Sequence, residues 1–305
     1  MNDHVIAMHH VTKTFGKKVA VDDLSLLVPA QSIYGFIGPN GSGKTTTMRM
    51  IMNILYPDRG AIDVFGKSVF GRPPDNIGYL PEERGLYKKM KVRELLEFLG
   101  GLKSNRNVAR EVEDWLVRLQ LAACANQKIE TLSKGMSQKV QFIAAVVTRP
   151  PLLVLDEPFS GLDPVNMEVI RQAILELRAQ GTTVILSTHD MALAENMCDY
   201  ICMIFRGKKV LDSTLDRIQS AYGHDTVRLR CEAGTAALHD LPGVTAVQDF
   251  GQLQELQLAP GCDPQTVLKA VLDRTAVYGF DLARPSLHAI FVRIAGPEAQ
   301  EVGHA

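Results

Sequence analysis

Residues 38–46 have the composition and spacing of a loop that binds the phosphates of a nucleoside triphosphate. The loop fills the pattern G-x-x-x-x-G-K-S/T and reads Gly38-Pro39-Asn40-Gly41-Ser42-Gly43-Lys44-Thr45-Thr46. Glycines allow the backbone N–H groups to turn inward around phosphates, and a side chain at Gly41 or Gly43 would obstruct that turn. Lys44 is then placed to contact the β- and γ-phosphates, and the Thr45 hydroxyl is suited to ligate Mg²⁺.

Two carboxylates follow a second apolar run. Leu152–Leu155 is typical of a buried strand, and Asp156 and Glu157 come directly after it. Ligand chemistry in open parallel sheets lies at the carboxyl ends of the strands. Asp156 is suited to hold Mg²⁺ directly or through water, and Glu157 is a candidate base for the attacking water. A strand that ends in Asp-Glu is commonplace by itself, so the catalytic interpretation depends on the phosphate loop.

His189 follows a third strand-like run, Thr182–Ser187, and is expected at the same edge of the sheet. An isolated histidine is usually structural. Next to a phosphate loop and two carboxylates, its imidazole is a candidate donor to the γ-phosphate or to the attacking water.

The elements that must position these groups indicate an α/β core. The phosphate loop lies between a strand-like run, Ser32–Ile37, and a helical pattern in which Met48, Ile51 and Leu55 share one face. The two later strands are separated by an amphipathic helix, and strand, helix, strand implies a parallel sheet. Val5–Val28 indicates a small antiparallel sheet.

The domain organisation follows from changes in pattern along the chain, which is long enough for two domains. Residues about 83–147 read as a helical insertion within the first domain, and the segment beyond the linker alternates strands and helices like a small α+β domain. The expected parts are a first domain at 1–215, a linker at 216–224 and an accessory domain at 225–305.

Composition argues against several classes of protein. The chain has 33 basic and 34 acidic residues, which gives no electrostatic case for binding nucleic acid. Its longest apolar runs, such as Phe142–Val147 and Tyr200–Phe205, are far shorter than the roughly 18 residues of a spanning helix. The start of the chain lacks the pattern of a secretory signal, and five scattered cysteines suggest a reducing interior. We therefore expect a cytoplasmic protein.

The motifs together resemble ABC-type ATPases over residues 4–215. In chain order they are the phosphate loop, Leu132-Ser133-Lys134-Gly135-Met136, Asp156-Glu157, Ser160-Gly161-Leu162-Asp163 and His189. The amino-acid sequences of residues 78–87 and 285–291 are similar to those of the ABC-2-type, sodium-efflux-like branch, whose members carry an extra C-terminal domain. The resemblance implies a P-loop (RecA-like) core that binds ATP and Mg²⁺.

The resemblance also implies a mode of action. In that family each ATP lies between the phosphate loop of one subunit and the signature loop of another, so a homodimer of nucleotide-binding domains is expected. Ser133, Lys134 and Gly135 would face the partner's nucleotide, and Asp163 would lie where the two sites are linked. Hydrolysis would drive a separate integral membrane permease, most simply an exporter, with this chain peripheral on the cytoplasmic face of the membrane.

The sequence departs from the family pattern at several positions. Lys134 stands where glycine is usual, and Met136 where glutamine is usual. Glu82 stands where a glutamine normally contacts Mg²⁺ and the attacking water; a carboxylate also ligates the metal but repels phosphate. Phe15 stands where a tyrosine more often stacks on adenine, although a phenylalanine in a turn is often only packed.

Two other functions stay open at this point. One is an ABC ATPase that acts on nucleic acid or the ribosome rather than in transport; its usual coiled-coil insertions, second nucleotide module or basic extensions are not visible in the sequence. The other is a regulatory nucleotide-binding module with an idle site. The intact acidic pair, lysine and histidine argue against idleness.

Overall fold

The computed structural model describes residues 4–71, 76–82, 85–222, 225–232, 238 and 240–296. The chain divides into two compact units, residues 1–212 and 213–305, each with its own sheet and core.

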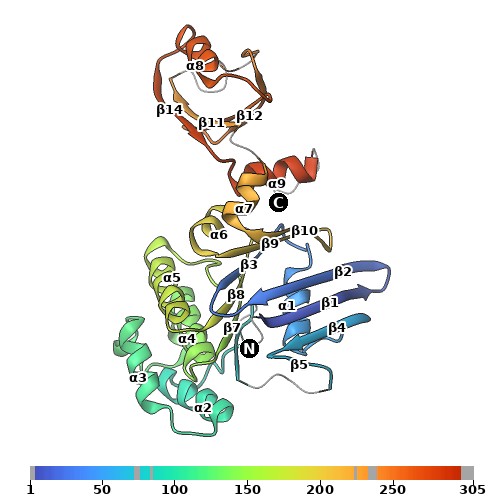
Figure 1. Ribbon diagram of the computed structural model, residues 1–305. Coiled ribbons are helices and arrows are strands. Elements are labelled where there is room, and N and C mark those ends of the chain that lie inside the picture. Colours follow the sequence, from blue (N-terminus) through green and yellow to red (C-terminus); the bar gives the residue numbers. More distant parts are fainter. Residues whose placement is uncertain are drawn as a thin grey trace. The chain divides into compact units, whose positions relative to one another are not determined.

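The first unit is built on a six-stranded sheet with the order β10-β9-β3-β8-β7-β6 (Figure 1). Its described neighbours β9, β3, β8, β7 and β6 run parallel. The three central strands are buried along their whole length, as expected when helices cover both faces. The strand bounds are β3 Ile33–Ile37, β6 Ile77–Leu80, β7 Leu152–Asp156, β8 Thr183–Thr188, β9 Tyr200–Phe205 and β10 Lys208–Thr214.

An antiparallel sheet completes the first unit. Its order is β2-β1-β4-β5, with bounds β1 His4–Phe15, β2 Lys18–Pro29, β4 Arg59–Val64 and β5 Lys67–Ser68. Helix α1 (Lys44–Ile51) lies between the two sheets, because its Met48 and Ile51 share one core cluster with Val21 of β2 and Phe36 of β3. The phosphate loop is thus held between two layers of strands.

Helices cluster in the predicted insertion, of which residues 83 and 84 lie outside the described residues. The insertion holds α2 (Val92–Ser104), α3 (Ala109–Arg118) and α4 (Lys134–Val146), with short 3-10 turns η1 (Ala122–Cys124) and η2 (Ile129–Thr131). The apolar spacing over Val108–Leu121 predicts one helix, but α3 ends at Arg118 because Gln120 adopts a φ of 60°, which a right-handed helix cannot continue. The remaining helices of this unit are α5 (Pro164–Ala179) and α6 (Met191–Met197).

The second unit contains an antiparallel sheet with the order β12-β13-β11-β14. One face packs on α8, where Val267 and Val271 join Val227, Leu229 and Leu256 in a separate core. The elements are α7 (Leu215–Ala221), β11 (Thr226–Cys231), β12 (Val244–Asp249), β13 (Gln254–Leu258), α8 (Pro264–Leu272), β14 (Val277–Ala283) and α9 (Leu287–Ala295).

The segment expected to be a linker, residues 216–224, is largely helical instead. Helix α7 spans Leu215–Ala221, and residues 223 and 224 lie outside the described part. The Thr214 hydroxyl accepts the Arg217 N–H at the start of the helix, and Ile218 is buried. An amino-terminal cap and a buried apolar side chain are what a short helix needs to persist, so this segment belongs to the second unit.

Candidate active site

The phosphate loop joins β3 to α1, and its glycines have different requirements. Gly38 has a φ of 146°, and a β-carbon there would lie 2.1 Å from the carbonyl oxygen of Ile204. Gly43 has a φ of 112°, and its β-carbon would lie 2.5 Å from the Ala20 carbonyl oxygen. At Gly41, with a φ of 75°, no described atom lies within 4 Å of that position. A side chain at Gly41 would therefore strain the backbone without meeting a neighbour, unlike the obstruction expected from the sequence.

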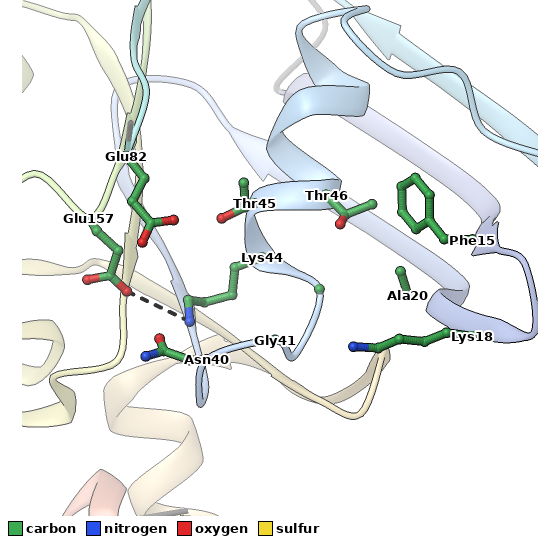
Figure 2. Close-up of a pocket in the computed structure, with 11 residues that line it drawn as sticks. Phe15, Lys18, Ala20, Asn40, Gly41, Lys44, Thr45, Thr46, Glu82 and Glu157 are labelled. Carbon is green, nitrogen blue, oxygen red and sulfur yellow. Dashed lines mark ion pairs between the residues drawn. The ribbon is translucent and has the colours of Figure 1, made fainter. Parts of the chain in front are cut away.

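Helix α1 begins beside a cavity of about 390 Å³ (Figure 2). Its N-cap is Gly43, which offers no side-chain acceptor, so the first N–H groups and the positive end of the helix are available to an anion. The cavity is lined by Phe15, Lys18, Ala20, Asn40, Gly41, Gly43, Lys44, Thr45, Thr46, Glu82 and Glu157.

Lys44 places a buried ammonium in this cavity. Its Nζ donates to the carbonyl oxygens of Gly38 (2.7 Å) and Pro39 (3.2 Å), and it lies 3.8 Å from Glu157 Oε1. Burial lowers the pKa of Lys44 below 10.5, although the nearby carboxylates, Glu157 foremost, oppose the shift. A cation with little solvent around it interacts strongly with phosphate oxygens.

Asp156 ends β7 with one oxygen paired and the other unpaired. Its Oδ1 accepts hydrogen bonds from Ser187 Oγ (2.6 Å) and Thr45 Oγ1 (3.2 Å). Its Oδ2 is buried and has no hydrogen-bond partner among the described residues. A carboxylate oxygen and a neighbouring hydroxyl are the donors that Mg²⁺ prefers.

The described residues offer a divalent ion only part of a coordination shell. No group of three or more His, Cys, Asp or Glu suited to a metal occurs in the described ranges. Mg²⁺ commonly binds through one or two carboxylates and completes its shell with water and phosphate oxygens. The unpaired Asp156 oxygen and the Thr45 hydroxyl fit such a site.

Glu157 adopts an uncommon backbone conformation beside the cavity, with a φ of 49°. Its N–H donates to Ser187 Oγ over 2.9 Å, and its Oε1 lies 3.0 Å from His189 Nδ1. The carboxylate is largely buried, while His189, just beyond β8, is more than half exposed. This arrangement can hold a carboxylate next to a phosphate-bound water and orient it through the imidazole.

Glu82 and Phe15 both line the cavity, from different parts of it. Figure 2 shows Glu82 beside Glu157, on the side of Lys44 away from Phe15. Phe15 is the last residue of β1, is 49% exposed and pairs with Lys18 across the turn. A flat ring at the mouth of the cavity can stack on a nucleotide base.

The structure adds residues that sequence reasoning missed. Lys18 and Ala20 line the cavity next to Phe15, and Ser187 connects Asp156 with Glu157. The turn after Phe15 could have indicated Lys18, because hairpin partners face each other. Nothing local marks Ser187, whose partners lie 31 and 30 residues earlier.

The comparisons with known proteins agree with this geometry. Residues 21–160 match the ABC transporter family, and residues 214–295 match the DrrA1-3-like ATP-binding protein C-terminal domain. The uncharacterized ABC transporter ATP-binding protein YhaQ of Bacillus subtilis is 40% identical over 294 residues, which cover 96% of this chain and 99% of that protein. The chain belongs to the ABC transporter ATP-binding proteins.

Other relatives and structures place this ATP-binding protein within the family. The daunorubicin resistance ATP-binding protein DrrA3 of Streptomyces coeruleorubidus is 31% identical, covering 98% of each chain. The Nod factor export ATP-binding protein I of Burkholderia lata is 32% identical, covering 97% of this chain and 98% of that one. The solved ATP-binding subunit of an ABC transporter is 28% identical with a TM-score of 0.67, covering 72% of this chain and 93% of that one.

The resemblance inferred from the motifs is thereby confirmed, and with it the P-loop α/β fold. This ABC transporter ATP-binding protein binds ATP and is an ATPase coupled to transport. Within the described ranges, no helix combines the length and apolar character needed to cross a bilayer.

The signature segment of the ATP-binding protein, Leu132–Met136, does not line the phosphate-loop cavity. Ser133 and Asp163 are the N-caps of α4 and α5, and their side chains accept the N–H groups of Met136 (3.2 Å) and Asn166 (2.9 Å). The ammonium of Lys134 lies against Gly161, where a β-carbon would be 2.4 Å from it.

Gly135 likewise packs against the segment that follows Glu157. A β-carbon at Gly135 would lie 3.6 Å from Leu162 and 3.3 Å from Asn166. One chain therefore brings its signature and Ser160–Asp163 segments together, but not to its own phosphate-loop cavity.

Proposed function

We propose that two copies of this ATP-binding protein close around two ATP molecules and thereby drive a separate integral membrane permease, from the cytoplasmic face of the membrane. One observation carries the proposal. The phosphate-loop cavity and the signature segment are two different places in one chain, and each lies at the N-terminal end of a helix. A second copy supplies the missing half of each site. A bacterial ABC cassette solved as a dimer, with a TM-score of 0.65, supports the fold on which this depends.

In the proposed site the phosphate loop and Lys44 bind the triphosphate, and Thr45 and Asp156 hold Mg²⁺. The unpaired Asp156 oxygen beside the Thr45 hydroxyl supports this assignment. When bound, the ion neutralises charge on the phosphates. Glu82 lies in the same cavity and is proposed as a further ligand that also contacts the attacking water.

Glu157 is proposed as the base that orients and deprotonates the attacking water. Its carboxylate is held from two sides, by Lys44 at 3.8 Å and by His189 at 3.0 Å. His189 is exposed enough to reach a γ-phosphate at the cavity edge. The aromatic ring at the other end, Phe15, is proposed to stack on adenine.

Across the proposed dimer, Ser133, Lys134 and Gly135 face the partner's nucleotide. The positive end of α4 and the Lys134 ammonium, which has no acidic partner among the described ion pairs, favour an approaching phosphate. Asp163 caps α5 at the end of the loop that follows Glu157, so it is placed to connect the two sites.

Export is proposed from the relatives, two of which are a drug-resistance and a Nod-factor-export protein. An apolar surface on the helical insertion supports contact with a hydrophobic partner. Tyr87 and Phe98 pack edge to face with centroids 6.3 Å apart, and Leu102 on the same helix as Phe98 is 68% exposed. Exposed apolar groups that gather in this way mark interaction sites.

With a net charge of −1, no binding to nucleic acid is proposed.

Substitution of Glu157 by Gln tests the proposal. Hydrolysis should fall about 10²- to 10⁴-fold because the general base is lost. ATP with Mg²⁺ should still bind, and size-exclusion chromatography should then show an ATP-stabilised dimer. A variant that hydrolyses ATP as fast as the parent contradicts the assignment of the base, and a variant that stays monomeric with ATP contradicts the dimer.

A matched control separates this effect from general loss of a carboxylate. Glu168 lies on the surface of α5 and pairs with Arg171 at 2.7 Å. Glu168→Gln should leave hydrolysis and dimerisation at the parental level.

A further inference from the structure

Asp58 holds the end of β1, although it does not line the nucleotide cavity. Its backbone N–H donates to the Thr12 carbonyl oxygen at 2.8 Å. Its Oδ2 accepts the Thr14 N–H at 2.7 Å and the Thr14 hydroxyl at 2.6 Å, while its Oδ1 lies 2.8 Å from Lys13 Nζ. The carboxylate therefore contacts both residues that precede Phe15.

The strand pairing explains why these bonds matter. Strand β4 pairs with β1 only as far as Thr12 and Arg59, so the Thr14 N–H lies beyond the ladder. The side chain of Asp58 supplies the acceptor that a longer β4 would have supplied. Hydrogen bonds from Lys13 and Thr14 lower the pKa of Asp58 to about 2, so the carboxylate is ionised at neutral pH.

Lys13 connects this carboxylate to the aromatic ring. Lys13 and Phe15 are two residues apart near the end of β1. The ammonium lies 5.6 Å from the centroid of the Phe15 ring, within cation–π distance. Asp58 fixes the Lys13 ammonium, and the ammonium contacts one face of the Phe15 ring. The other face of the ring remains available to stack on a planar partner.

We propose that Asp58 is a positioning residue that, through Lys13 and Thr14, holds the ring of Phe15 in place to stack on the base of ATP. The inference rests on the proposed role of Phe15 and extends it to a carboxylate 43 residues away in the chain. Asp58 itself touches neither base nor phosphate. It acts by keeping the end of β1 and the cation on the ring in one arrangement, so that the base does not have to order them on binding.

Steady-state ATPase kinetics of the full chain test the inference. Asp58→Ala should raise KM for ATP about three- to tenfold, the range of one aromatic stacking contact, with kcat within about twofold of the parent. Asp58→Asn should raise KM less, because the amide oxygen still accepts the Thr14 bonds but forms no ion pair with Lys13. Inorganic tripolyphosphate, which has no base, should inhibit the parent and both variants with the same Ki.

A double variant separates positioning from a general structural effect. If Asp58 acts through the ring, then Asp58→Ala should add nothing to Phe15→Ala, and the double variant should have the KM of Phe15→Ala alone. If the rises in KM caused by Asp58→Ala and Phe15→Ala multiply in the double variant, the inference is overturned. A parental KM in Asp58→Ala also overturns it, as does a Ki for tripolyphosphate that rises as much as the KM for ATP. Thermal unfolding establishes that each variant is folded.

The proposed function and this inference fail in different ways. A parental KM in Phe15→Ala overturns the stacking role and the inference with it, but leaves the Glu157 experiment unaffected. The matched control is Asp23→Asn, which removes the charge of another exposed carboxylate of the same sheet. Asp23 pairs with His10 at 2.8 Å, and its substitution should leave KM for ATP unchanged.

Discussion

The hydroxyl of Ser187 donates a hydrogen bond of 2.6 Å to Oδ1 of Asp156. The hydroxyl oxygen of Ser187 also accepts the backbone N–H of Glu157 at 2.9 Å, so one buried side chain on β8 contacts both the Asp156 carboxylate and the Glu157 backbone at the end of β7. The two strands are paired in parallel with Asp156 opposite Ser187, which makes this contact a consequence of strand register.

Ser187→Ala should therefore impair hydrolysis. It removes one of the two hydroxyls on Asp156 Oδ1 and leaves the Glu157 N–H without its acceptor, at a cost in unfolding free energy of about 1–3 kcal/mol. We expect a reduction in kcat of about tenfold or more, because misplacing a catalytic group is costly. Urea unfolding and ATPase assays measure the two effects.

The control for Ser187 is Ser32→Ala. Ser32 is also buried and donates to the Pro29 carbonyl oxygen at 2.8 Å, but it lies at the other end of β3 from the phosphate loop. It should lose comparable stability and keep the parental kcat. If both variants lose activity equally, Ser187 has no orienting role.

Stability should depend on pH through Lys44. Burial lowers the pKa of Lys44 in the folded protein below the 10.5 of the unfolded chain. Between those two values the unfolded state binds more protons, so the free energy of unfolding rises with pH, and the cost of burying the ammonium is fully present only below the folded pKa. The unfolding free energy of the parent minus that of Lys44→Met should therefore increase as pH rises toward 10.5.

Lys103→Met is the matched control for this pH dependence. Burial also lowers the pKa of Lys103, whose Nζ donates to the Ala144 carbonyl oxygen at 3.4 Å in the helical insertion. The unfolding free energy of the parent minus that of Lys103→Met should also increase as pH rises. The KM of Lys103→Met for ATP should equal that of the parent. If the difference in unfolding free energy between the parent and Lys44→Met does not change with pH, the Lys44 ammonium is not desolvated.

The glycines of the phosphate loop should differ in tolerance. Gly38→Ala meets backbone of β9 at 2.1 Å and adopts a φ of 146°, so we expect a loss above about 3 kcal/mol of unfolding free energy. Gly41→Ala has open space among the described residues and a φ of 75°, so its cost should be about 1–2 kcal/mol. Equal losses in chemical denaturation would contradict this difference.

Metal removal tests the unpaired oxygen of Asp156. Chelation by EDTA should abolish hydrolysis, and added Mg²⁺ should restore it. Asp156→Asn should require more Mg²⁺ for half-maximal activity, because an amide replaces the anionic ligand. It should also keep or raise the free energy of unfolding without metal, since the buried orphan charge is gone. An unchanged Mg²⁺ requirement would exclude Asp156 as a ligand.

Much of the fold and of the candidate site could be predicted from contiguous sequence. The phosphate loop, its flanking strand and helix, and the strand that ends at Asp156 are local patterns, since glycine spacing and runs of apolar residues reflect backbone conformation and burial directly. The family resemblance is carried by such motifs, and it was confirmed. The end of α3 and the helix within residues 215–221 were missed, because one residue with positive φ and one cap decide them.

The sequence by itself determined which chemical groups this protein has and in which local elements they lie. Only the tertiary structure decided which of them meet: Ser187 with Asp156, Lys18 with the cavity, and Asp58 with the end of β1. Those contacts depend on strand register and sheet order between distant segments, and the energy that sets them comes from packing of the whole core. No short stretch of sequence contains that information.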